Sequence, residues 1–146
     1  MTTALIIYGS TTGNTEAAAE TIGSALRDRG VETKTLNVTD AGPGEIAGGH
    51  DLILLGCSTW GDEEIEFQDD FIPFYESMED LPLEGRNVAV FGCGDSSYTY
   101  FCGAVDEIEK KAEAAGANIV SAPLKIDGDP GSAEDDIREW AGALDI

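Results

Sequence analysis

The stretch Ser10–Thr15, with the sequence STTGNT, joins a short apolar run to a segment with helical periodicity. The run, Ala4–Tyr8, is followed by Gly9 and is typical of a buried strand. At the start of the following helix, unpaired backbone N–H groups and the positive end of the helix dipole favour an anion. The stretch adds hydroxyl donors and contains no Lys or Arg. It therefore predicts a site for one phosphate held by neutral donors, and not for a triphosphate with its metal.

Strand-like and helical segments alternate along the 146 residues, which predicts one domain spanning residues 1–146. Alternation of this kind is typical of a parallel sheet covered by helices on both faces. Ligands of such sheets bind at the carboxyl ends of the strands, near the point where the strand order reverses. The predicted strands are Ala4–Tyr8, Val31–Leu36, Leu52–Gly56, Asn87–Phe91 and Asn118–Ala122.

Four segments carry apolar residues at helical spacing. Three of these faces comprise Ala18, Ile22, Ala25 and Leu26; Phe101, Val105, Ile108, Ala112 and Ala115; and Ala133, Ile137, Trp140, Ala141 and Leu144. We expect Ser132 to cap the last helix, with Asp135 in its first turn. In the fourth segment, which contains Phe67, Phe71, Phe74, Tyr75 and Met78, Pro73 interrupts the pattern, so this helix either starts late or is kinked.

Two further polar loops follow the third and fourth predicted strands, at residues 57–64 and 93–102. Each contains an aromatic residue, Trp60 in the first loop and Tyr98 in the second. These rings either clamp a flat heterocycle from both faces or cap the sheet as apolar side chains. A clamp beside a phosphate site would describe a mononucleotide with a planar ring.

Acidic residues dominate the charge, with 29 Asp and Glu against 8 Lys and Arg and a formal net charge of −21. Such a chain is expected to repel nucleic acid and anionic membranes and to attract basic proteins. Solubility or adaptation to salt would explain the charge equally well. No signal peptide or transmembrane run is expected. Three cysteines without a C-x-x-C pair do not predict a disulfide framework, so we expect a reducing, cytoplasmic compartment and no metal site.

Three motifs resemble those of the short-chain flavodoxins, particularly those of sulfate-reducing bacteria. They are TTGNT at residues 11–15, STWGD at residues 58–62 and GCGDSSYTYFCGAVD at residues 92–106. The similarity covers nearly the whole chain, with the motifs in the same order and spacing. It implies a flavodoxin-like three-layer α/β sandwich, with a five-stranded parallel sheet in the order 2-1-3-4-5 and helices on both faces.

The resemblance also implies that the three loops bind flavin mononucleotide, FMN. Around Gly13, the donors to its phosphate would be Ser10, Thr11, Thr12, Asn14 and Thr15. Trp60 would lie on the inner face of the flavin ring and Tyr98 on its outer face. Backbone groups expected at the polar edge of the ring are those of Thr59, Gly61, Gly94, Asp95 and Cys102, and the further expected contacts are Ser58, Cys93, Tyr100 and Phe101.

By the same resemblance the protein is a low-potential one-electron carrier with non-covalently bound FMN, and not an enzyme, so that no catalytic residue is expected. It would shuttle electrons between redox proteins through the semiquinone/hydroquinone couple. Its expected partners are redox proteins with basic docking faces, such as reductases and ferredoxin- or cytochrome-linked enzymes, and the chain is expected to be a monomer. The acids around these loops either make the second potential strongly negative or form a solvated face. The alternative is an FMN-binding flavoenzyme or a dedicated partner of a single enzyme.

Residues at the strand ends argue against other α/β families. A receiver domain needs acids after the first strand and an aspartate after the third, where this chain has Gly9-Ser10 and Cys57-Ser58. No cysteine is followed six positions later by the arginine of a low-molecular-weight tyrosine phosphatase. Neither a G-x-G-x-x-G nor a Walker A pattern follows the first strand.

Overall fold

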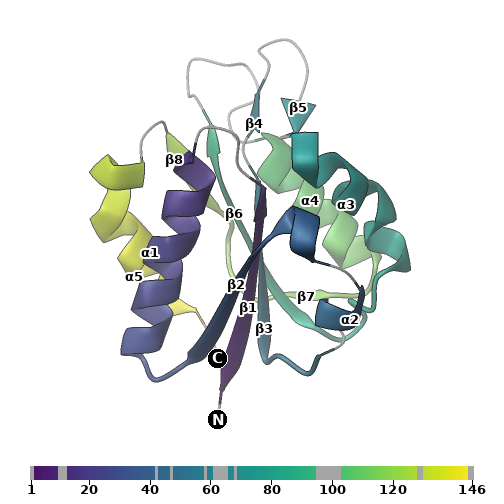
Figure 1. Cartoon of the computed structure of the whole chain (residues 1–146), viewed down its shortest axis with the longest axis horizontal. Coiled ribbons are helices and arrows are strands. Elements are labelled where there is room, and N and C mark those ends of the chain that lie inside the picture. Colours follow the sequence, from purple (N-terminus) through teal and green to yellow (C-terminus); the bar gives the residue numbers. More distant parts are fainter. Residues whose placement is uncertain are drawn as a thin grey trace.

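The centre of the protein is a parallel sheet in which the strands run in the order β2-β1-β3-β6, with β7 and β8 both beside β6 (Figure 1). The structure is a computed structural model and describes residues 2–9, 13–41, 43–46, 48–57, 59–60, 66–67, 69–94, 103–127 and 130–144. The strands are β1 Thr3–Gly9, β2 Glu32–Asn37, β3 Leu52–Cys57, β6 Asn87–Gly94, β7 Asn118–Ile119 and β8 Leu124–Asp127. With β6 as the fourth strand and β7 and β8 together in the fifth position, this arrangement confirms the predicted order 2-1-3-4-5.

The fifth position of the sheet differs from the prediction of one strand at residues 118–122. It is filled by two short strands, with β7 pairing the beginning of β6 and β8 pairing its end. Pro123 lies between them and has no N–H to donate to a ladder. The carbonyl oxygen of Ala122 instead accepts a hydrogen bond of 2.9 Å from Trp140 Nε1. As a result, β8 brings Asp127 level with Gly94 at the end of β6.

Two apolar cores lie on opposite faces of the sheet because successive residues of each strand point to opposite sides. In β1, Leu5 and Ile7 belong to one core, whereas Ala4 and Ile6 belong to the other. The helices α1 (Asn14–Asp28) and α5 (Glu134–Ala143) cover the face of Ala4, and α3 (Ile72–Ser77) and α4 (Gly103–Ala114) cover the face of Leu5, as Figure 1 shows. This arrangement is the predicted three-layer sandwich.

The helical faces predicted from the sequence are the buried ones. Ala18, Ile22, Ala25 and Leu26 of α1 are all buried. So are Val105, Ile108 and Ala112 of α4, and Ile137 and Ala141 of α5. Ala115, Trp140 and Ala133 are partly buried against these cores, whereas Phe101 lies outside the described residues.

The third helix starts late, which settles the alternative left by Pro73. A short 3-10 turn, Asp69–Phe71, precedes α3, and Pro73 lies in the first turn of α3, where its missing N–H breaks no helical hydrogen bond. Phe71, Phe74 and Met78 are buried against the core below, and the 3-10 turn Met78–Asp80 follows. Tyr75 is half-buried at the edge of this contact.

The predicted cap of the last helix is wrong. A 3-10 turn, Pro130–Ala133, leads into α5, so that Ala133 and not Ser132 occupies the N-cap. Asp135 lies in the first turn, as predicted, together with Glu134 and Asp136. Three acids near the positive end of the helix dipole stabilise a helix start that has no side-chain cap.

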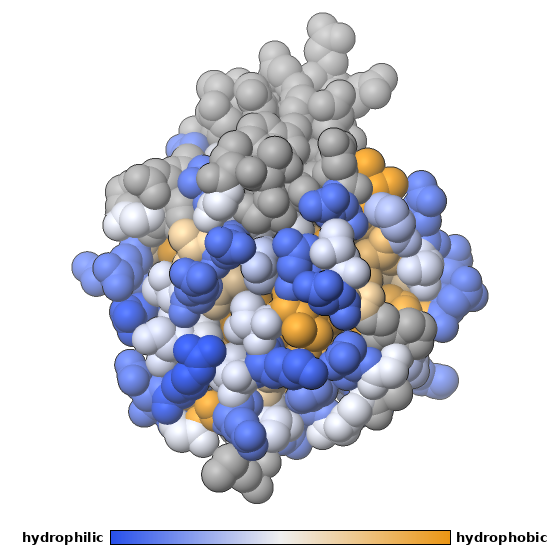
Figure 2. All heavy atoms as spheres, in the orientation of Figure 1, coloured by the Kyte–Doolittle hydropathy of each residue, from blue (hydrophilic) through white to orange (hydrophobic). Residues whose placement is uncertain are grey.

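The described surface is hydrophilic over most of the face in Figure 2, with separate small apolar areas between charged side chains. Two short elements, α2 (Pro43–Ile46) and the 3-10 turn Val38–Asp40, connect β2 to β3 on this surface. Across the described residues, no helix has the length and apolar character needed to span a membrane.

Candidate cofactor-binding site

Three neighbouring strands end at one edge of the sheet. The last residue of β1, Gly9, is level with Cys57 at the end of β3, and β6 continues from Phe91, beside Gly56, to Gly94. In a parallel sheet all carboxyl ends lie at the same edge, and ligands bind there. The three segments predicted to bind the cofactor therefore follow three adjacent strand ends, at the top of Figure 1.

The start of α1 has the geometry expected of an anion site. Gly13 occupies the N-cap position with φ +91°, a left-handed conformation that suits glycine, and its carbonyl oxygen accepts the first helical hydrogen bond from Ala17 at 2.9 Å. The N-cap residue has no side chain, and apart from its chain neighbours no atom of the described residues lies within 4 Å of the position a Cβ would take. The first N–H groups of a helix have no acceptor within the helix, and this makes helix starts common anion sites.

Asn14 and Thr15 follow in this first turn, as predicted from the sequence. Thr15 is fully buried, and Asn14 is half-buried. The other predicted phosphate donors, Ser10, Thr11 and Thr12, lie outside the described residues. Their hydrogen bonds remain a prediction.

The second loop is supported by a small antiparallel pair that the sequence did not predict. The strands β4 (Thr59–Trp60) and β5 (Glu66–Phe67) pair through Thr59 with Phe67 and Trp60 with Glu66. They enclose residues 61–65 in the sequence, and β4 contacts both β6 and α4. The backbone of Thr59 and Trp60 is thus close to the end of β6, as expected for one binding edge.

The third segment begins at a tightly packed part of β6. Gly92 has no room for a side chain, because a Cβ there would overlap with the carbonyl oxygen of Cys57 and lie 2.6 Å from Val105 Cγ2. Cys57 and Cys93 are buried in the cores on opposite faces of the sheet, where they pack as small apolar side chains. Cys93 therefore faces the core, and Gly94 is half-buried at the strand end.

Several predicted contacts lie outside the described residues, and the positions of their rings and hydrogen bonds stay predictions. These residues are Ser58, Gly61, Asp95, Tyr98, Tyr100, Phe101 and Cys102, and the side chains of Thr59 and Trp60. The structure thus brings together Gly13, Asn14, Thr15, the backbone of Thr59 and Trp60, Cys93 and Gly94 around one edge.

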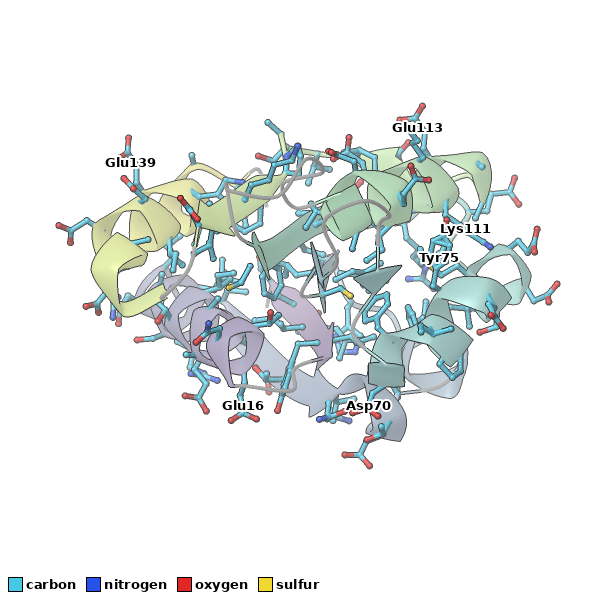
Figure 3. The ribbon with its side chains drawn as sticks, turned by 90° about the horizontal axis from the view of Figure 1, so that it is seen from above. Glu16, Asp70, Tyr75, Lys111, Glu113 and Glu139 are labelled. Carbon is cyan, nitrogen blue, oxygen red and sulfur yellow. The ribbon has the colours of Figure 1, made fainter. Side chains whose placement is uncertain are left out.

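Acidic residues outnumber basic ones near this edge, where Lys125 of β8 pairs with Asp106 in the first turn of α4. Glu16 in the first turn of α1, Asp70 before α3 and Asp127 at the end of β8 are exposed, and Figure 3, which views the molecule from this side, labels the first two. The loop segments 10–13, 58–65 and 95–102 contain no Lys or Arg. Among the described residues, no group of three His, Cys, Asp or Glu side chains could hold a metal ion.

Comparison with known proteins agrees with this geometry. The sequence model of the family described as Flavodoxin matches residues 6–140. Flavodoxins of Maridesulfovibrio salexigens and of Nitratidesulfovibrio vulgaris are each 54% identical to the chain, covering 99% of it and 97% of their own length. The crystal structure of oxidised Flavodoxin 2 from Bacillus cereus superposes with a TM-score of 0.86 at 34% identity, covering 95% of this chain and 94% of its own. The chain therefore belongs to the flavodoxin family, the members of which bind FMN and transfer electrons.

Proposed function

We propose that this flavodoxin is a low-potential one-electron carrier that shuttles electrons between redox proteins through non-covalently bound FMN. The flavin supplies the redox chemistry when bound, and the chain binds it, shields it and sets its potentials. The main support for this proposal is that three strand ends and the glycine-capped start of α1 lie at one edge of the sheet. The chain thereby offers a neutral anion site and loops that contain Trp60 and Tyr98 at one edge.

The residues present suit FMN better than a nucleotide of higher charge. The open left-handed turn at Gly13 and the first turn of α1 provide neutral donors for one phosphate. The segment around them contains no cation that would neutralise several phosphates. We place the phosphate at this helix start and the ring between the loops that follow β3 and β6.

The acidic edge supports a low potential. A carboxylate about 8 Å from a negatively charged, reduced ring, at an effective dielectric constant of about 20, disfavours the reduced state by about 2 kcal/mol. For a one-electron couple this corresponds to about 90 mV. The phosphate would add to this field, because no Lys or Arg in the loop neutralises it.

The surface charge supports partners with basic docking faces. A formal net charge of −21 steers basic proteins towards the chain, and salt screens such steering beyond about 8 to 10 Å. The odd number of cysteines supports a reducing, cytoplasmic compartment.

Stepwise anaerobic reduction of the purified protein, followed by visible absorbance, tests the proposal. A carrier should accumulate the half-reduced flavin midway and take up the second electron at a much lower potential. Direct passage to the fully reduced state would favour the flavoenzyme alternative. Failure to bind added FMN would exclude the assignment altogether.

A matched pair of variants tests the electrostatic part. Asp127→Asn removes an exposed charge at the carboxyl edge of the sheet, whereas Glu32→Gln removes an exposed charge at its opposite edge, beside Thr3. The first should raise the second potential by up to about 90 mV, and the second should leave it nearly unchanged. Equal shifts would mean that overall charge, and not the acidic edge, sets the potential.

A further inference from the structure

A side-chain hydrogen bond joins the end of β1 to the first turn of α1. The hydroxyl group of Tyr8, the second-to-last residue of β1, donates to Glu16 Oε2 at 2.8 Å. Glu16 is the third residue of α1. The two residues therefore enclose the segment predicted to hold the phosphate, including Gly13.

The Tyr8 side of this contact is anchored. Its ring is half-buried and packs against the core between the sheet and the helices α1 and α5. Its backbone is held in the sheet between Asn37 of β2 and Gly56 of β3. The hydroxyl group thus has a fixed position from which to hold the start of α1.

The Glu16 side of the contact is exposed and charged. In Figure 3 its carboxylate projects outward from the start of α1. A carboxylate in a first helical turn is attracted by the same dipole that would bind a phosphate, and it repels that phosphate at close range. The position of the Glu16 carboxylate therefore affects how closely a phosphate can approach the start of α1.

We propose that the Tyr8–Glu16 hydrogen bond is a positioning contact for the phosphate of FMN. It holds the first turn of α1 against the end of β1 and keeps the Glu16 carboxylate on the outer side of the helix start. This inference rests on the placement of the phosphate under the proposed function.

Tyr8 remains a hydrogen-bond donor over the whole physiological range. Burial, followed by the hydrogen bond to Glu16 and the charges of Glu16, Glu20 and Asp40, raises the pKa of Tyr8 to about 12. Ionisation of Tyr8 therefore does not remove this donor near neutral pH.

Titration of the apoprotein with FMN and with riboflavin, which lacks the phosphate, tests the proposal. Tyr8→Phe keeps the ring and removes the donor, so it should weaken FMN binding about five-fold. Riboflavin binding should stay unchanged, because riboflavin has no phosphate to position. Tyr75→Phe makes the same change at a half-buried tyrosine on the other face of the sheet and should affect neither ligand.

Two changes at Glu16 separate the hydrogen bond from the charge. Glu16→Gln keeps an acceptor oxygen for Tyr8 and removes the charge, so FMN should bind at least as tightly as to the wild type. Glu16→Ala removes both, and it should bind FMN more weakly than Glu16→Gln does. Adding Tyr8→Phe to Glu16→Ala should cause no further loss, because the contact is already gone.

The outcomes distinguish failure of the Tyr8–Glu16 positioning role from failure of the phosphate placement on which it rests. Equal affinity of the wild-type chain for FMN and riboflavin would reject the phosphate placement. An FMN-to-riboflavin ratio that Tyr8→Phe leaves unchanged would overturn the positioning role alone. The positioning role would also be overturned if Tyr8→Phe weakened the binding of FMN and riboflavin equally and lowered the thermal midpoint of the apoprotein, since that pattern indicates a purely structural contact.

Discussion

The contact between β3 and β6 at Gly92 leaves no space for even one methyl group. A Cβ on Gly92 would overlap with the main-chain oxygen of Cys57 and lie 2.6 Å from Val105 Cγ2. Because this oxygen belongs to the backbone of β3, the overlap can be relieved only by shifting β3, β6 or α4. Overpacking of a core costs about 1 to 3 kcal/mol, and a clash with backbone belongs at the upper end of that range. We therefore expect Gly92→Ala to cost about 3 kcal/mol, or a fall of about 10 °C in thermal midpoint for a chain of this length.

The neighbouring glycine, Gly56, provides an informative comparison. A Cβ there would overlap with the ring of Phe91, which is a side chain and not backbone. Gly56→Ala should also destabilise the fold. When Phe91→Leu is added to Gly56→Ala, the double variant should recover about 1 to 2 kcal/mol of that loss, which a double-mutant cycle measures as the coupling energy. Adding Val105→Ala to Gly92→Ala should recover much less of the lost stability, since the overlap with the Cys57 carbonyl oxygen would remain.

Urea and thermal unfolding of these variants as apoproteins measure the effects directly. Gly142→Ala in α5 is the control, because outside its own helix backbone no atom of the described residues lies within 4 Å of the added Cβ, and it should stabilise the helix by about 0.5 to 1 kcal/mol. A loss below about 0.5 kcal/mol for Gly92→Ala, or its full rescue by Val105→Ala, would refute the backbone-clash reasoning.

Three further outcomes follow from single contacts and from pKa shifts. Arg29→Met removes a hydrogen bond of 2.8 Å from Nη1 to the carbonyl oxygen of Ala141, which joins α1 to α5, and it should lower the free energy of unfolding in urea by about 1 kcal/mol. Burial raises the pKa of Glu109 above its ordinary value of 4.5, so Glu109→Gln should raise the thermal midpoint at pH 7, with a gain that disappears as the pH falls below 4.5. Because the pKa of Tyr8 rises from 10.0 to about 12, the folded chain keeps this proton where the unfolded chain loses it, and stability should fall between these two pH values. Absorbance titration of tyrosinate should show this late-titrating group in the wild type and not in Tyr8→Phe.

The central strands could be predicted from the sequence because their side chains are buried on both faces. All six residues of β3 are buried, which explains its continuous apolar run. The faces of α1, α4 and α5 followed from helical spacing for the same reason. Burial at a regular period is a property of the residues themselves, and it needs no knowledge of the neighbouring elements.

The missed features depend on contacts between distant segments. The fifth strand is divided because Trp140 Nε1 donates a hydrogen bond to the carbonyl oxygen of Ala122 and because Pro123 has no N–H to donate. The sequence of residues 118–122 alone could not predict that their partner would be a tryptophan in α5. The β4–β5 pair is two residues long on each side, too short for a periodic signal. The Asp127 carboxylate reaches the binding edge only because β8 resumes the ladder beside Gly94.

The start of α1 was the part of the site most accessible to sequence reasoning. Its signal is local, since a glycine followed by polar residues after a buried strand predicts a helix start that can hold an anion. The Tyr8–Glu16 contact was missed because it depends on how the helix returns beside its strand. A tyrosine near a strand end and a glutamate eight residues later have no spacing rule that would pair them.

The ion pairs of the described residues do not explain the excess of acidic residues. Lys34, Lys110, Lys111, Lys125 and Arg138 form ion pairs, and their side chains are between 24% and 75% exposed. Pairs of this kind stabilise a protein by about 0 to 1 kcal/mol each, whereas the unbalanced charge destabilises the compact state through self-repulsion. The burial of its two apolar cores contributes far more to the stability of the chain. Under the proposed function, the acids of segments 58–65 and 95–102, which contain no Lys or Arg, would disfavour the reduced flavin and attract a basic partner.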